Sequence, residues 1–489
     1  MSILTTSSAT DTLTVGVSSE PLLHRDPLTL YRDVRAVTED CYLFESLSGP
    51  DDDLRSAVVG WGRLAELRFH EGRVELDAEG GLGAVLRAAL DRALGPGHLL
   101  RAPSAVFEAI RAVQAVFTVR TELPSSTFAF GFLTTLAYRS AWDIEELPEP
   151  ERPEATPRQT LTLFQHTAWY DLASGTARLL TATGPLLPEP APVPPAGTPD
   201  GLELPSAPAP FAVRDSVAEQ TFLDRTERCL GHIGVGDVYQ IQIGHRIDVE
   251  TALTPLAAYR RLRHRSPAPY MYLLPWAGRT VVGASPELYV RVVDGVLTMR
   301  PIAGTVAARP DGDEAADARQ VAELSDSAKQ RAEHVMLVDL CRNDIGRVCR
   351  PGTLSVDSMM RAEPFGYVHH LVSTVSGELE PGLDLWDVVR ATFPAGTMTG
   401  APKIRAMELI EEIEREPRGL YAGAVGLFDV RGFALFALCI RTAVHHEGVF
   451  SIQASAGVVA DSEPAEEWAE TLTKLSALHW ALTGTELTP

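Results

Sequence analysis

Apolar and polar residues alternate along this chain with two different periods. Over residues 41–80 and 158–183 the alternation is short-range, which predicts antiparallel strands. The sequence DLASG at 171–175 predicts the turn between two of them. Over residues 28–40 and 81–94 apolar residues recur every three or four positions, which predicts amphipathic helices. The first part of the chain is therefore expected to combine sheets with helices.

Ten prolines lie between Pro185 and Pro210, in a tract that favours extended backbone and cannot hold a helix. We interpret this tract as the linker between two regions. The Ser/Thr-rich start of the chain is expected to be flexible. The predicted organisation is a flexible N-terminus at 1–20, an N-terminal region at 21–183, the linker at 184–212 and a C-terminal domain at 213–489.

Short strands alternate irregularly with helices after the tract. This order favours an α+β fold built on antiparallel sheets over a regular βαβ repeat. The expected helices cover residues 216–236, 254–267, 314–344, 403–415 and 463–482.

Composition and charge exclude several classes of protein. Of 489 residues, 45% are hydrophobic, enough for a large core. The balance of 43 Lys and Arg against 65 Asp and Glu gives a net charge of −22. Neither a nucleic-acid-binding protein nor a basic membrane-surface protein is therefore expected. An anionic substrate would need local positive charge.

The cysteines and the N-terminus indicate where the protein resides. Five widely spaced cysteines form no CxxC pair, so neither a disulfide framework nor a zinc site is expected. No signal peptide and no apolar run of about 18 residues is present, so no membrane association is expected. These features predict a cytoplasmic protein.

Acidic residues cluster on the last predicted helix. Asp461 or Ser462 is expected to cap it. Glu467, Glu470 and Lys474 follow at i, i+3 and i+7, which places them on one face. Such a face is compatible with an ordinary salt-bridged surface. If it is concave, Glu470 and a partner such as Glu333 would suit Mg²⁺, and Lys474 would suit a substrate carboxylate.

Three glycine-containing motifs permit close backbone approach to an anion. They read GASPE (283–287), PIAGT (301–305) and FPAGTMTGAPK (393–403). None matches a P-loop or the GxGxxG fingerprint, which disfavours a nucleotide.

Together with their neighbours, these motifs carry a resemblance. GASPE, RPIAGT, ELSDSAKQRAEHVMLVDLCRNDIGRV, HHLVSTVSG, FPAGTMTGAPKIRAMELIEEIE, YAGAVG and AGVVADSEPAEEWAETLTK occur in order. The chain thereby resembles the chorismate-utilising enzymes, above all anthranilate synthase component I and 2-amino-2-deoxyisochorismate (ADIC) synthase. The resemblance is dense over 215–489 and looser over 20–183. It implies an α+β fold of two antiparallel β-sheets packed as a sandwich, with flanking helices around a central cleft. It also makes 213–489 the chorismate-binding catalytic domain.

The resemblance assigns roles residue by residue. Glu333 and Glu470 match Mg²⁺ ligands, and Glu467 matches a supporting acid. Glu287 matches the general acid that protonates the departing C4 hydroxyl. The implied catalytic set is Glu287, His370, Gln240 and Thr305, and the implied substrate-binding set is Arg441, Lys474, Tyr421, Ala456, Gly457 and Thr397.

Two positions distinguish the nucleophiles used in the family. Enzymes that add water have a lysine where this chain has Gln240, and an amide cannot deprotonate water. Aminodeoxychorismate synthases resemble PIKGT, with a nucleophilic lysine where this chain has Ala303. Ammonia addition at C2 is therefore expected. A separate glutamine amidotransferase subunit would supply the ammonia, since no glutaminase motif follows the synthase region. A homodimer or hetero-oligomer is compatible with this arrangement.

The final product stays open. His370 favours elimination of pyruvate to give anthranilate, which we expect as the product. Ser455 and the altered stretch 364–368 favour the alternative, a specialised ADIC synthase that retains pyruvate. An aminodeoxychorismate synthase is less favoured, and a noncatalytic binding paralogue is disfavoured by the complete acid set.

The family's tryptophan-sensing pattern is only partly present. It resembles LLES and NPSPYM, where this chain has LFES (43–46) and Ser266 in place of Asn. The segment after Ser46 also differs. The resemblance therefore does not extend to tryptophan inhibition.

Overall fold

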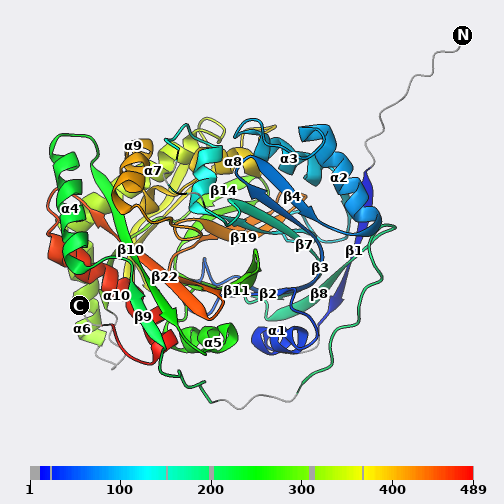
Figure 1. Ribbon diagram of the computed structural model, residues 1–489, viewed down its shortest axis with the longest axis horizontal. Coiled ribbons are helices and arrows are strands. Elements are labelled where there is room, and N and C mark those ends of the chain that lie inside the picture. The colour runs from blue at the N-terminus through cyan, green and yellow to red at the C-terminus, as the bar shows by residue number, and fades with distance from the viewer. Residues whose placement is uncertain are drawn as a thin grey trace, which may run out of the picture.

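The computed structural model describes residues 12–22, 25–149, 152, 154–197, 203–307, 314–365 and 368–487. Strands form the centre of the molecule, and helices lie along its upper, lower and left-hand sides in the view of Figure 1. The β1–β5 pair is the single parallel pair among those that the described strands form. The expected α+β class with antiparallel sheets is confirmed.

The residues before the proline tract form eight strands and three α-helices in the described part of the chain. The strands are β1 (Leu13–Pro21), β2 (Cys41–Glu45), β3 (Ser56–His70), β4 (Arg73–Asp77), β5 (Phe117–Arg120), β6 (Gly131–Leu136), β7 (Gln159–Asp171) and β8 (Thr176–Thr183). The helices are α1 (Pro27–Arg35), α2 (Gly80–Leu94), α3 (Ala105–Gln114) and the 3₁₀ helix η1 (Tyr138–Asp143).

The remainder of the chain carries the other elements. The strands are β9 (Ala212–Asp215), β10 (Gln240–Glu250), β11 (Tyr270–Trp276), β12 (Arg279–Ser285), β13 (Leu288–Val293), β14 (Val296–Met299), β15 (Ile302–Ala307), β16 (Ser355–Phe365), β17 (Val368–Glu378), β18 (Gly400–Ala401), β19 (Ala424–Asp429), β20 (Ala434–Leu438), β21 (Thr442–His446) and β22 (Val449–Val458). The helices are α4 (Glu219–Gly234), α5 (Pro255–Arg265), α6 (Glu314–Asp326), α7 (Ala328–Gly346), α8 (Leu385–Thr392), η2 (Gly396–Met398), α9 (Lys403–Glu414) and α10 (Pro464–Thr483).

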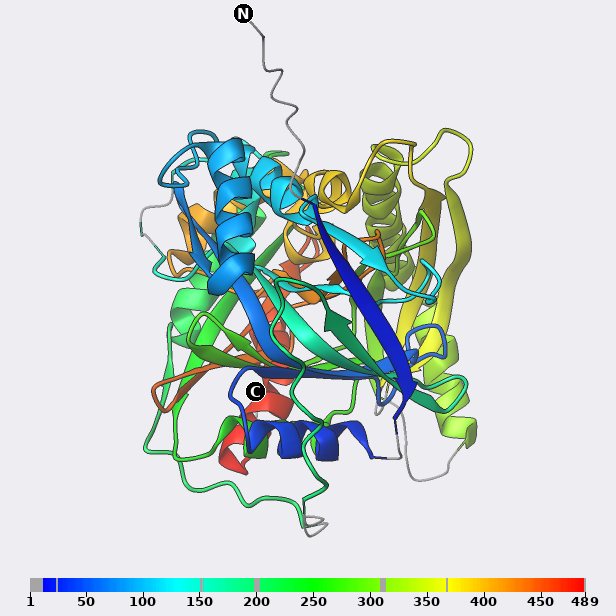
Figure 2. The ribbon, with the colours of Figure 1, turned by 90° about the vertical axis from the view of Figure 1, so that its right-hand side faces the viewer.

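The strand pairs branch at β7. One arm runs through β3, β2, β11, β12, β21 and β22 to β10. The other runs through β6, β19, β20, β13 and β14 to β17. In both arms, strands from before and after the proline tract pair directly, as β2 does with β11. Figure 2 shows the dark-blue strand β1, which pairs with β8, crossing this side of the molecule diagonally.

The long strand β3 contributes to two hydrophobic cores. On β3, Val58, Leu67 and Phe69 are buried in the larger core, which includes α2, α3 and α8. Val59 and Trp61 point the other way, into a second core with α1, α5 and α10. Successive side chains of a strand point to opposite faces, so one apolar strand can contribute side chains to both cores.

Most predicted elements are confirmed, including the helix at 81–94 and the two strands of 158–183. The single helix expected at 314–344 is wrong. It is two helices, because Ser327 is extended and its hydroxyl caps α7 by accepting from the Gln330 N–H at 3.4 Å.

Two other expectations, about where an element of secondary structure begins, are wrong. Residues 1–11 lie outside the described part, but the flexible N-terminus is wrong from Leu13 onward, because β1 pairs with β5 and β8. Neither Asp461 nor Ser462 caps α10. The N-cap is Glu463, and the Ser462 hydroxyl instead accepts from the Val459 N–H at 3.0 Å.

The five cysteines are unpaired and buried. Among the described helices, none is long and apolar enough to cross a membrane.

Candidate active site

The predicted functional side chains converge on one cavity of about 220 Å³, called here the site cavity. It lies where β10 and β22, neighbours on the left of Figure 1, meet α7, α10 and the end of β12. Its lining includes Gln240, Glu287, Glu333, His370, Thr397, Tyr421, Arg441, Gly457, Glu467, Glu470 and Lys474. Residues more than 200 positions apart are thus brought together as the resemblance implied.

Glu287 is a buried acid at the turn between β12 and β13. Its side chain is within the cavity wall, and burial raises its pKa to about 8. The Thr397 hydroxyl, which donates to Oε1 at 3.0 Å, and the charge of Lys474 act in the opposite direction but do not offset the burial. Glu287 therefore holds a proton at neutral pH and can donate it.

Three carboxylates form the acidic side of the cavity. Glu333 comes from α7, and Glu467 and Glu470 come from successive turns of α10. Among the described residues, no three His, Cys, Asp or Glu side chains are close enough to form a complete metal cage. Mg²⁺ commonly takes only one or two carboxylates and fills its other positions with water and substrate oxygens. The three glutamates supply oxygen donors of the kind that this ion prefers.

Two cations face the acids. Lys474 pairs with Glu470 at 2.5 Å and donates to the Ser455 carbonyl at 2.8 Å. Arg441 donates to the Lys474 carbonyl at 3.0 Å, and burial lowers its pKa. The backbone of Arg441 has φ +49°, a left-handed conformation that is uncommon for a residue with a side chain and that recurs at functional sites. Both cations are placed to receive carboxylates.

The side chains of His370 and Gln240 carry no charge at neutral pH. Burial lowers the pKa of His370 to about 4, and its Nδ1 lies 2.9 Å from the Gly304 carbonyl. Since a carbonyl only accepts, this bond places the proton on Nδ1. Gln240 is 2% exposed, and its Oε1 is buried without a hydrogen bond in the described structure. Ala303 also lines the cavity.

Two predicted positions contribute no described side chain to the site cavity. Thr305 lies on β15 opposite His370, and its side chain is outside the described residues. Ala456 is on β22 with its side chain directed away from the site cavity, whose lining contains its neighbours Ser455 and Gly457.

A hydrogen-bonded network closes one wall of the cavity. The Tyr421 hydroxyl lies 2.7 Å from the Ser455 hydroxyl, which donates to Gln242 Oε1 at 2.8 Å. Ser455 therefore adds hydrogen bonds to this wall. Gln242 and Gln453 were missed as lining residues. Their spacing of two from Gln240 and Ser455 was the available signal, because alternate residues of a strand share a face.

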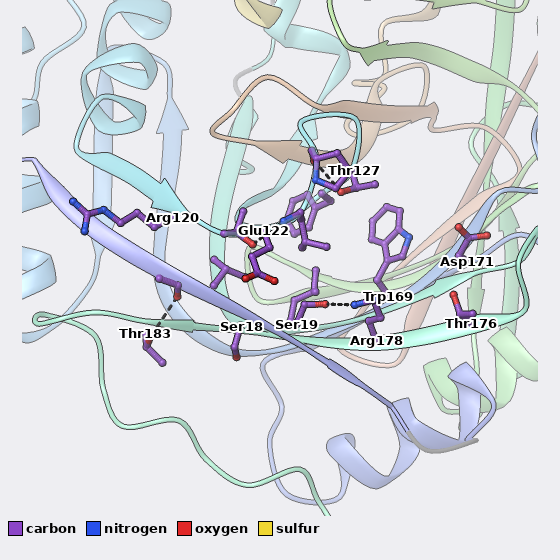
Figure 3. Close-up of a pocket in the computed structure, with 17 residues that line it drawn as sticks. Ser18, Ser19, Arg120, Glu122, Thr127, Trp169, Asp171, Thr176, Arg178 and Thr183 are labelled. Carbon is purple, nitrogen blue, oxygen red and sulfur yellow. Dashed lines mark hydrogen bonds between the residues drawn. The ribbon is translucent and has the colours of Figure 1, made fainter.

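A larger cavity of about 970 Å³ lies elsewhere, among β1, β7, β8 and the loop at 121–127 (Figure 3). Trp169 stacks on Phe128 with ring centroids 6.1 Å apart, and Arg178 donates to Ser19 at 3.1 Å. None of the predicted site residues lines it. The larger cavity is therefore not the one that the sequence motifs indicate.

The region that corresponds to tryptophan sensing is nearly filled. A cavity of about 30 Å³ lies beside Ser46, Tyr270 and Met271. Asp53, from the divergent segment, accepts from the Tyr270 hydroxyl at 2.7 Å and pairs with Arg300. The altered segment thus contacts Tyr270, one of the residues that line this small cavity.

A buried proton donor beside acids that suit Mg²⁺ and cations that suit carboxylates defines an enzyme acting on a small organic anion. The chain belongs to the chorismate binding enzyme family, whose model matches residues 39–479. It is 47% identical over 461 residues to a 2-amino-4-deoxychorismate synthase of Streptomyces globisporus, covering 92% of each chain. It is 41% identical over 371 residues to anthranilate synthase component 1 of Streptomyces coelicolor, covering 72% of each.

The fold is also similar to that of a solved structure. Anthranilate synthase component I from Streptococcus pneumoniae superimposes with a TM-score of 0.67 and 29% identity, over 87% of this chain and 92% of that one.

Proposed function

We propose that this protein is a Mg²⁺-dependent chorismate-aminating synthase that adds ammonia at C2 and expels the C4 hydroxyl as water, giving ADIC. The observation that carries this proposal is a buried carboxylic acid, Glu287, in the same cavity as the acids, the cations and the unprotonatable Gln240. A noncatalytic role would not require this combination.

Charge complementarity supports chorismate as the substrate. Arg441 and Lys474 would pair with its two carboxylates, despite the chain's net charge of −22. Glu333 and Glu470 would hold Mg²⁺, with Glu467 beside them. When bound, the ion would neutralise a substrate carboxylate and so offset the acids around it.

The proposed step balances with one ammonia in and one water out. The ammonia lone pair forms the bond to C2, both ring double bonds shift (C1=C2 to C1=C6, and C5=C6 to C4=C5), and the C4–O bond breaks. Glu287 gives its proton to the departing oxygen, which leaves as water. The new C–N group then loses a proton, which restores the acid form of Glu287.

At positions 240 and 303 the described lining lacks the side chains that water addition and amination at C4 would use there. The amide of Gln240 cannot take a proton from water, so addition of water has no base at this position. Ala303 has no amine, so a covalent lysine adduct leading to amination at C4 is not available here.

ADIC as the end product is supported by the relative with 92% mutual coverage. The name 2-amino-4-deoxychorismate describes an amino group at C2 and loss of the C4 hydroxyl, which is the constitution of ADIC. Anthranilate, the product we first expected, is the second candidate. His370 favours it, because its position in the cavity allows a neutral imidazole to act as a base in pyruvate elimination.

Incubation with chorismate, Mg²⁺ and an ammonium salt tests both candidates. Chorismate loss with ADIC detected by mass and no pyruvate is expected. Anthranilate fluorescence with equimolar pyruvate would replace the first product assignment by the second. No ammonia-dependent consumption would refute both. In the cell, a separate glutamine amidotransferase subunit is proposed to supply the ammonia.

A further inference from the structure

A second cavity shares a wall with the site cavity. It has a volume of about 530 Å³ and is called here the rear cavity. Its lining includes Arg246, Ser451 and the exposed His446 and Glu447, so it reaches the protein surface at the β21–β22 turn. Tyr421 and Gln453 line both cavities. These two side chains are therefore part of the wall between the two cavities.

One continuous strand face connects the cavities. On β22, Val449 and Ser451 line the rear cavity, Gln453 lines both, and Ser455 and Gly457 line the site cavity. The paired strand β10 repeats this order. Its Arg246, opposite Gln453, lines the rear cavity, and its Gln242, opposite Gly457, lines the site cavity. Between them lies Gly244, opposite Ser455, which adds no side chain to the passage.

Gln453 is placed to handle a small polar molecule. It is 8% exposed, and within the described residues its amide makes no hydrogen bond to the protein. Its amide atoms are not among the fully buried atoms without a partner, so the amide faces the cavity space and is free to bind a small polar molecule there. The amide oxygen can accept from an N–H group, and the amide N–H can donate to a lone pair. Ammonia offers both.

The site cavity favours a separate route for the nucleophile. At about 220 Å³ it is smaller than the roughly 300–1,000 Å³ of most ligand pockets, so a bound dicarboxylate would fill it. Ammonia arriving after chorismate would then need another side from which to reach C2. The buried, unpartnered Oε1 of Gln240 can accept its N–H at the end of such a route.

We propose that ammonia enters through the rear cavity, passes Gln453 and reaches Gln240 while chorismate occupies the site cavity. This route rests on the proposed function, because it requires ammonia to be the nucleophile. The Tyr421–Ser455–Gln242 network forms the fixed side of the passage, and Gln453 forms the side that must move aside.

Blocking the rear cavity after folding tests the route. Ser451→Cys places a half-buried thiol there, and N-ethylmaleimide can modify it selectively because the five native cysteines are buried. The unmodified variant controls for folding. Thr176→Cys, which lies in the distant 970 Å³ cavity, controls for the label.

Stoichiometric labelling of Ser451→Cys should raise the KM for free ammonia at least about tenfold, with the KM for chorismate within twofold of the unlabelled variant. Labelling Thr176→Cys should change neither. An unchanged ammonia KM in fully labelled Ser451→Cys would overturn the route, as would an equal rise in both KM values. Wild-type protein that fails to consume chorismate with ammonia would instead refute the proposed function.

Discussion

The pH at which Glu287 loses its proton should set the upper limit of activity. Burial raises its pKa to about 8. For a single titration, about nine-tenths of the free enzyme then carries the proton at pH 7 and about one-tenth at pH 9. We predict that kcat/KM for chorismate falls about tenfold between these pH values. The decrease follows because only the protonated acid can donate to the departing hydroxyl.

The assay must separate this titration from that of the nucleophile. Initial rates of chorismate loss would be measured with total ammonium adjusted at each pH, so that free ammonia stays constant and saturating. Because kcat/KM reports the free enzyme, the descending limb can be compared with the pKa of the unliganded cavity.

Thr397→Val provides a directional control. The Thr397 hydroxyl donates to Glu287 at 3.0 Å and stabilises the carboxylate form, so its loss should raise the pKa. A hydrogen bond to a charged group exceeds a neutral one by about 1 kcal/mol, which corresponds to roughly 0.7 of a pH unit. The descending limb of the kcat/KM profile should therefore move to higher pH in this variant.

Two results would refute this reasoning. A descending limb centred below pH 6 would mean that Glu287 is ionised at neutral pH and cannot be the donor. Glu287→Gln with a wild-type rate and the same limb would assign the titration to another group.

Three further predictions concern the metal, the nucleophile and regulation. Glu470→Gln should abolish Mg²⁺-dependent turnover, while its melting temperature changes little, because the exposed Lys474 pair contributes about 0–1 kcal/mol; a wild-type rate at saturating Mg²⁺ would contradict the ligand role. Gln240→Lys should give isochorismate from chorismate without ammonia, by mass spectrometry, and Gln240→Met should not; absence of isochorismate from the lysine variant would count against the role of this position. Millimolar tryptophan should leave the rate unchanged, because the cavity beside Ser46 holds only about 30 Å³; inhibition would show that a site opens there.

The sequence supported the helix at 81–94 and the strands of 158–183 because their periodicity is local and uninterrupted. The break at Ser327 was missed because a serine fits a helix as well as a cap, and only the backbone geometry distinguishes the two.

The residues of the candidate site were likewise predicted only in part. Residues such as Glu287 and Lys474 were found through contiguous motifs. Gln453 was not, because its position between two cavities depends on the β10–β22 register. The hydrogen bond from Ser455 to Gln242 likewise joins residues 213 positions apart. No local pattern encodes such a pairing.

The β10–β22 register also limits how this part of the chain can vary. Inserting or deleting one residue between Gln453 and Gly457 would reverse every following side chain, placing Ala456 in the cavity and directing Gly457 toward the core. The strand can therefore accept exchanges of side chain far more readily than changes of length. Relatives with altered chemistry at this wall should differ from this chain by substitution and keep the same residue count along β22.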